Sequence, residues 1–207
     1  MGQQKIAIFG ASGHGRVVAD IAVCTGWNVH FYDDAIPEKE MTLGMPYGGN
    51  FQNLISNVDQ YSAAFVAIGN NRLRLSLQQS LLDAGFYIPT LVHPSSTISR
   101  FASIESGTVV MPGAVINAAA HVGCACIINT GASIDHDCLL EDGVHISPGA
   151  HLAGIVSVGK CSWIGIGASI RQQVRIGINV TVAAGAVVVK NVEDNATVAG
   201  VPAVKMR

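Results

Sequence analysis

The sequence predicts two domains, an α/β domain followed by a parallel β-helix, in a chain of 207 residues. The first part of the chain alternates apolar, strand-like segments with amphipathic, helix-like segments, an order typical of a parallel sheet. From Ile98 to Val188 an aliphatic residue then recurs at every sixth position without interruption. Two periodicities in one chain indicate two folding units.

The α/β domain is predicted over residues 1–92, and its order of elements is Rossmann-like. The strand-like segments are KIAIFG, WNVHFYDD, AAFVAIG and FYIPTLV, and the helix-like segments are GRVVADIAVCTG and NRLRLSLQQSLLDAG. Four leucines give the second helix an apolar face that we expect to pack on the sheet, namely Leu73, Leu77, Leu81 and Leu82. The segment HPSS at His93–Ser96 breaks the pattern and marks the domain boundary.

The β-helix is predicted over residues 97–207. Reading every sixth residue from Ile98 gives sixteen aliphatic residues in sixteen positions, and the fourth residue after each is small or β-branched. A three-sided solenoid explains both series, because each hexapeptide then forms one short strand and one corner with the long aliphatic side chain inside. An α-helix does not explain them, since a period of six drifts around a helix of 3.6 residues per turn.

The predicted corners carry residue types that tolerate a positive φ angle. These residues are Gly107, Gly113, Gly131, Asp137, Gly143, Gly149, Gly167, Asn179, Gly185 and Asn191. Sixteen hexapeptides at three per coil predict slightly more than five coils. With strands about 4.8 Å apart, the prism would be roughly 25 Å tall.

Composition and charge exclude several classes of protein. No apolar run approaches the roughly 20 residues that cross a bilayer, and the first residues lack the features of a signal peptide, so we expect a cytoplasmic protein without a membrane partner. A net charge of −2 without a basic stripe argues against nucleic-acid binding. Five cysteines without CxxC spacing argue against a disulfide framework or a closed zinc site. A charged fraction of only 13% suggests a surface covered by another subunit.

The hexapeptide pattern and the closing segment Gly200–Ala203 resemble the hexapeptide-repeat acyltransferases, whose β-helix is left-handed. Within that family the chain resembles the sugar-nucleotide N-acetyltransferases of the bacillosamine pathway over nearly its whole length. The resembling segments are Gly10–Gly15, Asp33-Asp34, Ala67–Asn71, Asn129–His145 and Gly200–Met206.

This resemblance implies acetyl-CoA as co-substrate, a UDP-linked amino sugar of the 4-amino-4,6-dideoxy type as acceptor, and no metal. It also implies a homotrimer with active sites between adjacent subunits. Sialic acid O-acetyltransferases share much of the pattern, so O-acetylation of a sialic-acid-like sugar stays an alternative.

His136 is the candidate general base. It lies two positions after the inward Ile134, where a side chain of a β-helix projects outward. Acetyl transfer needs a base to take a proton as the amine attacks the thioester, and imidazole suits neutral pH. In the resembling enzymes an acidic residue after the base raises its basicity, a role that falls to Asp137. Those enzymes usually carry Glu there, so the shorter Asp changes the geometry.

Gly154 follows His136 by 18 residues, which is one coil of three hexapeptides. A glycine there admits the acyl group, and its N–H can stabilise the oxyanion, although a plain corner glycine explains the residue equally well. The resemblance assigns acetyl-CoA contacts to His145, Ile166 and Ala184. Asn129 matches a residue that helps to hold the site, or it belongs to a stacked asparagine ladder.

The segment Gly10–Gly15 follows a strand and opens a helix, an arrangement that offers backbone N–H groups to phosphate. Its GxxGxG spacing differs from the dinucleotide fingerprint. An acidic pair follows the second strand about twenty residues later, where nucleotide folds bind ribose. With the resemblance, the predicted UDP-sugar site consists of Ser12, Gly13, His14, Asp33, Asp34 and Gly69. A tight turn with a solvated acidic pair is the alternative, and Asn70 and Asn71 are alternatively a helix cap.

Two further hypotheses stay open at this point. Solenoids of this kind can hold zinc between subunits, as in γ-class carbonic anhydrases, with His121, His145 and His151 as candidate ligands. The first domain alone would suit an NAD-binding protein or a sugar-nucleotide sensor, although the missing fingerprint weighs against NAD.

Overall fold

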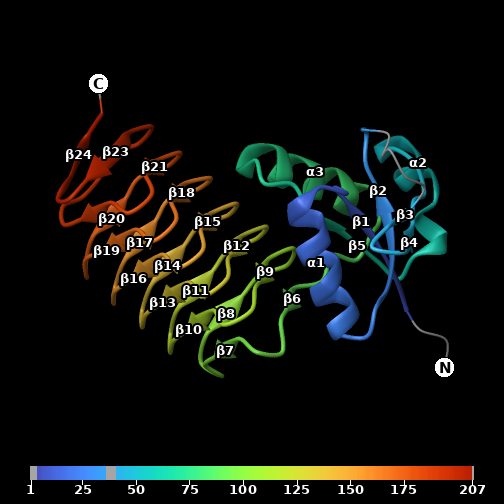
Figure 1. The fold of residues 1–207 in the computed structure, drawn as a ribbon, viewed down its shortest axis with the longest axis horizontal. Coiled ribbons are helices and arrows are strands. Elements are labelled where there is room, and N and C mark those ends of the chain that lie inside the picture. Colours follow the sequence, from blue (N-terminus) through green and yellow to red (C-terminus); the bar gives the residue numbers. More distant parts are fainter. Residues whose placement is uncertain (1–3, 36–40, 207) are drawn as a thin grey trace. The chain divides into compact units, whose positions relative to one another are not determined.

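The computed structural model describes residues 4–35 and 41–206. The chain divides into two compact units, Met1–Val92 and His93–Arg207. Residues 1–3 and 207, which the predicted domain bounds include, lie outside the described residues. Figure 1 labels the elements of both units.

The first unit is built on a parallel sheet in the order β2-β1-β5, with strands β1 (Lys5–Phe9), β2 (Asn28–Tyr32) and β5 (Ala63–Val66). After β2 the chain returns to the far side of β1, so the strand order reverses at β1. In open α/β sheets ligands bind outside the carboxyl ends of the strands at such a reversal. The remaining elements are α1 (Gly13–Cys24), β3 (Met41–Thr42), β4 (Met45–Pro46), α2 (Phe51–Ser56), a 3₁₀ turn (Val58–Gln60) and α3 (Asn71–Asp83).

Side chains that alternate along β1 form the core on both faces of this sheet. Ala7 and Phe9 belong to a cluster with Leu54 of α2 and Leu81 of α3. Ile6 and Ile8 are fully buried on the other side of the strand, and α1 contributes its own buried residues Val18, Ala19, Ile21 and Ala22. The strand-and-helix alternation of the sequence therefore produces a covered sheet.

The predicted leucine face of α3 is only partly right. Leu81 is fully buried and Leu77 packs against the core, whereas Leu73 and Leu82 are 48% and 41% exposed. The positions that α3 buries are Arg74, Gln78 and Leu81. These positions are spaced as i, i+4 and i+7, the spacing of one helical face, so two polar residues, Arg74 and Gln78, share the buried face with Leu81.

The second unit is a parallel β-helix made of three sheets, which Figure 1 shows as stacked coils. Sheet 1 contains β7 (Thr97–Ile98), β10 (Val115–Ile116), β13 (Ser133–Ile134), β16 (His151–Leu152), β19 (Ser169–Ile170) and β22 (Val187–Val188). Sheet 2 contains β8 (Ser103–Ile104), β11 (His121–Val122), β14 (Leu139–Leu140), β17 (Ser157–Val158) and β20 (Arg175–Ile176). Sheet 3 contains β9 (Val109–Val110), β12 (Ile127–Ile128), β15 (His145–Ile146), β18 (Trp163–Ile164), β21 (Thr181–Val182), β23 (Thr197–Gly200) and β24 (Ala203–Lys205). The strand order of sheet 3 begins with β6 (Leu91–Val92), the last two residues of the first unit.

The strand register confirms the hexapeptide solenoid. Ile116 pairs with Ile98 and with Ile134, so equivalent residues are separated by 18 positions, or one coil. The second residue of each two-residue strand is the aliphatic residue of the sequence repeat, and nearly all of these residues are at most 2% exposed. The interior of the prism is therefore a continuous aliphatic stack.

Positive φ angles mark the corners, as predicted for every residue of the series except Asn191. In its place Asn195 has a positive φ of 59°. The regular pattern ends here, because Val192 forms only an isolated bridge with Ile176. The sequence did not predict positive φ at Ala119, Ala125, Ile155, Cys161 and Gln173. Coil stacking fixes the backbone of these corners, and it places residues other than Gly, Asn and Asp in the left-handed region.

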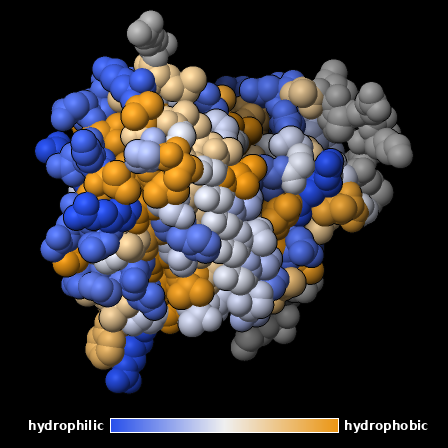
Figure 2. Space-filling view, turned by 60° about the vertical axis from the view of Figure 1, so that its left-hand side comes forward, coloured by the Kyte–Doolittle hydropathy of each residue, from blue (hydrophilic) through white to orange (hydrophobic). Residues whose placement is uncertain are grey.

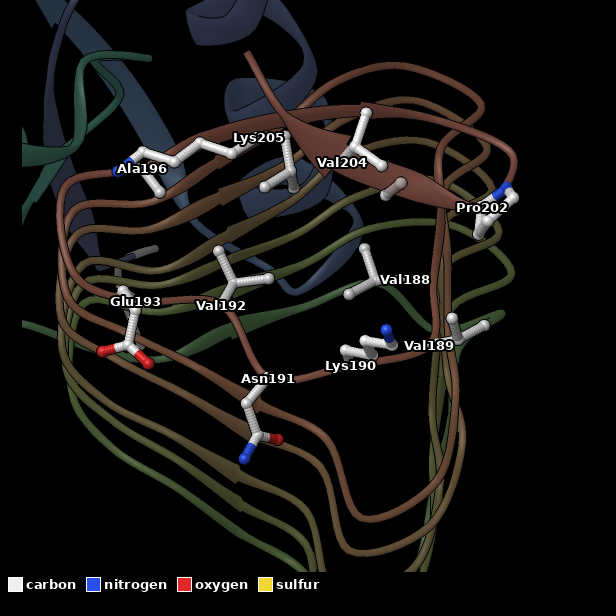
Figure 3. Close-up of a pocket in the computed structure, with 12 residues that line it drawn as sticks. Val188, Val189, Lys190, Asn191, Val192, Glu193, Ala196, Pro202, Val204 and Lys205 are labelled. Carbon is white, nitrogen blue, oxygen red and sulfur yellow. The ribbon is translucent and has the colours of Figure 1, made fainter. Parts of the chain in front are cut away.

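The last coil is followed by the antiparallel pair β23 and β24. A cavity of about 350 Å³ lies at this end, and Figure 3 shows the valines that point into it. Val188, Val192 and Val204 line it together with Lys190 and Lys205. None of the residues predicted to form the active site lines this cavity. In the described part of the chain, no helix is long and apolar enough to cross a membrane.

Candidate active site

The corners between sheet 1 and sheet 2 stack into one edge of the prism, here called the His136 edge. Strand pairing from β7 to β22 sets their alignment. Equivalent corner positions on successive coils are occupied by Arg100, Ala118, His136, Gly154, Gln172 and Lys190. The His136 edge therefore presents a different side chain on each coil.

His136 and Asp137 form a hydrogen-bonded pair on this edge. The imidazole Nδ1 lies 2.7 Å from Asp137 Oδ2, and the two side chains are 55% and 57% exposed. The hydrogen bond to Asp137 raises the pKa of His136 above its usual value, and the charge of Asp135 adds to this effect. Asp137 has a φ of +57°. In this left-handed conformation the short Asp137 carboxylate still reaches the imidazole.

Gly154 lies directly against the imidazole. A Cβ atom built on Gly154 would approach His136 Nε2 to 2.5 Å, so no side chain fits there without moving the ring. Hydrogen bonds from Ile155 N–H to the His136 carbonyl and from Gln173 N–H to the Gly154 carbonyl fix this corner. Among the described residues no acceptor receives the Gly154 N–H. The structure thus brings together Gly154 and His136, as the 18-residue spacing predicts.

A second carboxylate holds the backbone of the base. Asp135 Oδ1 accepts a hydrogen bond of 2.8 Å from the His136 N–H and one of 3.1 Å from the Asn117 side chain on the preceding coil. These two bonds fix the corner that carries the imidazole. The sequence did not single out either Asp135 or Asn117.

His145 lies on sheet 3 in a separate cluster. The Asn129 side-chain amide donates to His145 Nε2 over 3.1 Å, and the His145 ring stacks on Trp163 with 5.5 Å between the ring centroids. Trp163 Nε1 donates to the Ser147 hydroxyl over 2.6 Å. The structure therefore brings two predicted residues, Asn129 and His145, together, and it adds Ser147 and Trp163 to them.

Ile166 and Ala184 lie one coil apart on another edge of the prism, between sheet 3 and sheet 1. Asn129 lies on the same edge. The His136 edge, by contrast, separates sheet 1 from sheet 2. One chain therefore does not bring the candidate base and these candidate acetyl-CoA contacts to the same edge.

Large apolar side chains are exposed on the β-helix. Figure 2 shows hydrophobic residues scattered among hydrophilic ones on the visible face. The most exposed of these β-helix side chains before the last hairpin include Phe101 at 68%, Ile166 at 60% and Ile155 at 50%. Ile155 lies on the His136 edge and Ile166 on the edge that also carries Ala184.

In the first unit, the predicted nucleotide-sugar residues gather at the carboxyl ends of the strands. Asp33 Oδ2 accepts a hydrogen bond of 2.7 Å from the Ala11 N–H and so ties the loop after β1 to the end of β2. Asp34 Oδ1 accepts from the Phe51 N–H at the start of α2. The acidic pair thus holds neighbouring loops. Ser12 is the N-cap of α1, and its side chain makes no capping hydrogen bond.

Two glycines allow the loop after β1 to pack closely. Gly10 has a φ of +113°, and a Cβ atom on it would collide with the Ala67 carbonyl. A Cβ atom on Gly15 would collide with the Gly10 carbonyl. The first and last glycines of the GxxGxG pattern therefore allow the backbone segments to approach closely. Gly13 and Gly69 are both exposed, and a Cβ atom would meet only the end of the Arg16 side chain at Gly13 and nothing within 4 Å at Gly69.

The half-buried His14 and the buried Arg74 interact electrostatically in this region. Burial and the positive charge of Arg74 lower the pKa of His14 to about 4, so its imidazole is neutral at physiological pH. His14 Nε2 is buried and has no hydrogen-bond partner among the described residues. The Arg74 guanidinium donates to the carbonyls of Ile68 and Gly69 and to the Asn71 side chain.

Arg74 is the residue that sequence reasoning missed in this unit. It is 1% exposed, and its bonds shape the loop from Ile68 to Asn71 after β5. The helix cap proposed as an alternative for Asn70 is present, since its side chain accepts from the Leu73 N–H. The helical spacing of Arg74, Gln78 and Leu81 could have indicated that they share the buried face of α3. Charged side chains are rarely buried, however, so the charge of Arg74 argues against this face.

The zinc hypothesis finds no support within one chain. In residues 4–35 and 41–206 no three His, Cys, Asp or Glu side chains gather in a group able to hold a metal ion. His121, His145 and His151 lie on three different sheets. Two of these imidazoles bond serines instead, because His121 Nδ1 lies 2.7 Å from the Ser103 hydroxyl and His151 Nδ1 lies 2.8 Å from the Ser133 hydroxyl.

Comparison with known proteins agrees with both units. Residues 5–81 match the family model of the PglD N-terminal domain. The chain is 30% identical over 148 residues to GDP-perosamine N-acetyltransferase of Escherichia coli O157:H7, which covers 63% of this chain and 62% of the relative. It is 38% identical over 116 residues to UDP-N-acetylbacillosamine N-acetyltransferase of Bacillus subtilis (strain 168), which covers 52% of this chain and 51% of the relative. The alignments thus span less than two thirds of the length of these curated relatives.

Solved structures match over the whole chain. The acetyltransferase domain of PglB from Neisseria gonorrhoeae FA1090, in complex with acetyl coenzyme A, is 42% identical with a TM-score of 0.94 and covers 99% of this chain and 100% of that chain. PerB from Caulobacter crescentus, in complex with CoA and GDP-perosamine, is 38% identical with a TM-score of 0.94 and covers 100% of this chain and 99% of that chain.

The second unit accordingly has the left-handed β-helix fold that the resemblance implied. The identity and coverage of the PglB domain extend the likeness to both units. The chain belongs to the hexapeptide-repeat sugar N-acetyltransferases of the bacillosamine type.

Proposed function

We propose that the chain transfers the acetyl group of acetyl-CoA to the amine of a UDP-linked amino sugar of the 4-amino-4,6-dideoxy type. The observation that carries this proposal is the His136–Asp137 pair on an exposed edge with Gly154 against the imidazole. The relatives support the class of reaction, because they are named for N-acetylation of nucleotide-linked amino sugars.

The two nitrogens of His136 have different roles in this mechanism. Nδ1 donates its hydrogen to Asp137, so Nε2 keeps its lone pair and serves as the base. As the sugar amine attacks the thioester carbonyl carbon, Nε2 takes a proton from the nitrogen. The C–S bond then breaks, CoA leaves as a thiol or thiolate, and the acetyl group stays on the sugar as an amide. Asp137 stabilises the imidazolium that forms.

Gly154 contributes space and a hydrogen-bond donor. The missing side chain lets the acyl group approach His136 Nε2, and the N–H without an acceptor in the described chain is available for the oxyanion of the tetrahedral intermediate. Such donors act in the transition state, where negative charge develops on the oxygen.

The proposed UDP-sugar site lies at the carboxyl edge of the first unit, on the loops that carry Ser12, Gly13, His14 and Gly69. The unused Ser12 hydroxyl and the exposed residues Gly13 and Gly69 are available to the nucleotide, and the buried His14 Nε2 beside them has no hydrogen-bond partner in the described chain. Asp33 and Asp34 hold the surrounding loops and each keeps carboxylate lone pairs for the ligand. We assign Asn129 to the binding of the amino sugar, because its side chain contacts His145.

The active site is proposed to form between neighbouring chains of a homotrimer. The candidate base lies on one edge of the prism and the acetyl-CoA contacts Ile166 and Ala184 lie on another. A single acetyl-CoA molecule that touches both edges requires a second chain. The exposed Ile155 and Ile166 on these edges supply apolar surface for such an interface.

The test is an assay of thiol release. The protein is incubated with acetyl-CoA and a panel of UDP-, GDP- and dTDP-linked 4-amino sugars. The proposal predicts release of CoA that depends on the sugar and is fastest with UDP. Treatment with hydroxylamine distinguishes the amide product, which resists it, from the ester of an O-acetyltransferase. Preference for a GDP sugar would overturn the UDP assignment, and absence of thiol release with every amino sugar would overturn the reaction.

A further inference from the structure

The His136 edge carries a cation on the coil two steps before the base. Arg100, Ala118 and His136 hold equivalent positions on three successive coils, because β7 pairs with β10 and β10 with β13. With about 4.8 Å between stacked strands, the Arg100 backbone lies about 10 Å from that of His136 along the prism. The side chains of both residues are on the same edge and exposed.

Small residues lie between the cation and the base. The coil between them presents Ala118 and Ala119, which are both exposed and carry nothing beyond Cβ. On the other side of His136 the next coil presents Gly154. The edge therefore offers room on both sides of the imidazole, one side ending at Arg100 and the other leading past Gly154.

Arg100 is held in place without a carboxylate. Its guanidinium carbon lies 4.9 Å from the centre of the Phe101 ring, and Phe101 is 68% exposed. Among the described residues no Asp or Glu forms an ion pair with Arg100. A guanidinium stacked on an aromatic ring keeps its N–H donors for a ligand, and its planar fork suits phosphate oxygens.

The corner that holds Arg100 also differs from the one above it. Phe101 lacks the positive φ that the equivalent Ala119 and Asp137 adopt. The Ala119 N–H donates to the Phe101 carbonyl, whereas the Asp137 N–H donates to Ala118, one position earlier in its corner. The first corner of this edge thus departs from the repeat and presents Arg100 and Phe101 together.

We propose that Arg100 binds the diphosphate of the nucleotide sugar. In this arrangement the sugar ring lies over Ala118 and Ala119 while its amine meets His136 Nε2. The order of groups on the edge matches the order in the substrate, where the 4-amino group and the anomeric phosphate lie at opposite ends of one hexose ring. Phe101 is a positioning residue that orients the guanidinium. This inference rests on the proposed function, because it uses the nucleotide sugar as acceptor.

The experiment compares steady-state kinetics of wild type, Arg100→Ala, Arg100→Lys and Phe101→Leu. We expect Arg100→Ala to raise the KM for the nucleotide sugar by about 10- to 100-fold, the range for a lost hydrogen-bonded charge. The KM for acetyl-CoA and the kcat at saturating sugar stay within about twofold. Arg100→Lys recovers part of the loss, since Lys offers a point charge without the fork. Phe101→Leu shows a smaller rise of the same KM.

A matched control and a truncated substrate isolate the contact. Arg175 is an exposed arginine on sheet 2, two coils past that of His136, whereas Arg100 lies two coils before it, and Arg175→Ala is expected to leave both KM values unchanged. With the methyl glycoside of the amino sugar, which lacks the diphosphate, Arg100→Ala and wild type should have equal rates. An unchanged KM for the nucleotide sugar in Arg100→Ala, or an equal loss with the glycoside, overturns the proposal.

Calorimetric titration with UDP separates this inference from the proposed function. If wild type transfers no acetyl group to any nucleotide sugar, the proposed function fails. The titration still decides the contact, because weaker UDP binding by Arg100→Ala supports it and equal binding overturns it.

Discussion

At the scale of single residues, the chemistry depends on an imidazole whose pKa is set by its neighbour. Asp137 bonds Nδ1 of His136, and this bond is the main cause of the raised pKa. A base works only when unprotonated, so a raised pKa moves the onset of activity to higher pH while it makes the neutral imidazole a stronger base.

Replacement of that neighbour should therefore move the pH profile. Asp137→Asn removes the charge that stabilises the imidazolium, so the pKa of His136 falls. We expect the acidic limb of kcat/KM to shift to lower pH and the plateau to drop, in rates measured from about pH 5 to 9. Asp135→Asn, which removes a more distant charge, should shift the limb less. An acidic limb that stays in place in Asp137→Asn would rule out the pair as the source of the profile.

Gly154 offers a second test at this scale. In Gly154→Ala the new Cβ displaces the end of a side chain, since His136 Nε2 is the nearest atom. We expect kcat to fall by about 100-fold, the cost of a reacting group misplaced by roughly 1 Å, with little change in melting temperature.

The matched control is Gly159→Ala, where the new Cβ meets backbone atoms of Gly177 and Ile178. That variant should lose melting temperature. Gly154→Ala with wild-type kcat would show that the glycine is only a corner residue.

The contact between Gly154 and His136 was predictable because a rigid repeat converts spacing directly into position, whereas Asp137 was named through the family resemblance. Sequence reasoning did not reach Arg74. A buried arginine is stabilised by the carbonyls of Ile68 and Gly69, and these contacts exist only after the loop has folded. The same limit applies to Trp163, whose partners His145 and Ser147 lie on the coil before it.

At the scale of elements, the corners of the β-helix take their backbone conformation from the stack. Gly167 and Gln173 lie in corners with φ of +65° and +62°. Glycine adopts this region without strain, whereas a residue with a Cβ atom incurs about 1–2 kcal/mol. The same geometry is therefore relaxed at one corner and strained at the other.

Two substitutions with opposite signs test this strain. Gly167→Ala should lower the free energy of unfolding by about 1–2 kcal/mol, because open space surrounds the new Cβ and only φ is unfavourable. Gln173→Gly should raise it by about 0.5 kcal/mol, because relief of the strained φ, about 1–2 kcal/mol, exceeds the extra chain entropy, about 0.5–1 kcal/mol, that glycine loses on folding. Both are measured by urea unfolding, and a shift of the same sign in both variants contradicts the account.

The elements differ in how far the sequence predicts them. The solenoid was predictable because every hexapeptide repeats the same inward Ile, Val or Leu, so sixteen independent positions agree. Helix α3 was predicted as an element, but its buried face was not. Leucine was assigned inward on hydrophobicity alone, while Gln78 is 3% exposed and Leu73 is 48% exposed.

At the scale of the whole molecule, the proposed trimer explains why candidate residues lie on two edges of one prism. Light scattering should give three times the mass of the chain. A stronger test is complementation between His136→Ala and Ile166→Asp, each expected to be nearly inactive alone. Co-expressed chains should regain activity, because some interfaces then pair an intact His136 with an intact Ile166. No recovery in verified mixed trimers would place both residues in the same site of one chain.

Direct acetyl transfer to the amine of a nucleotide sugar, with His136 as base, can be tested by the turnover number of His136→Ala relative to wild type, with mass spectrometry of the product. We expect wild type to form a product heavier by one acetyl group. We also expect His136→Ala to retain both KM values while its kcat falls by about 10²–10⁴-fold, the usual contribution of a general base. Undiminished turnover by His136→Ala would contradict this role of His136.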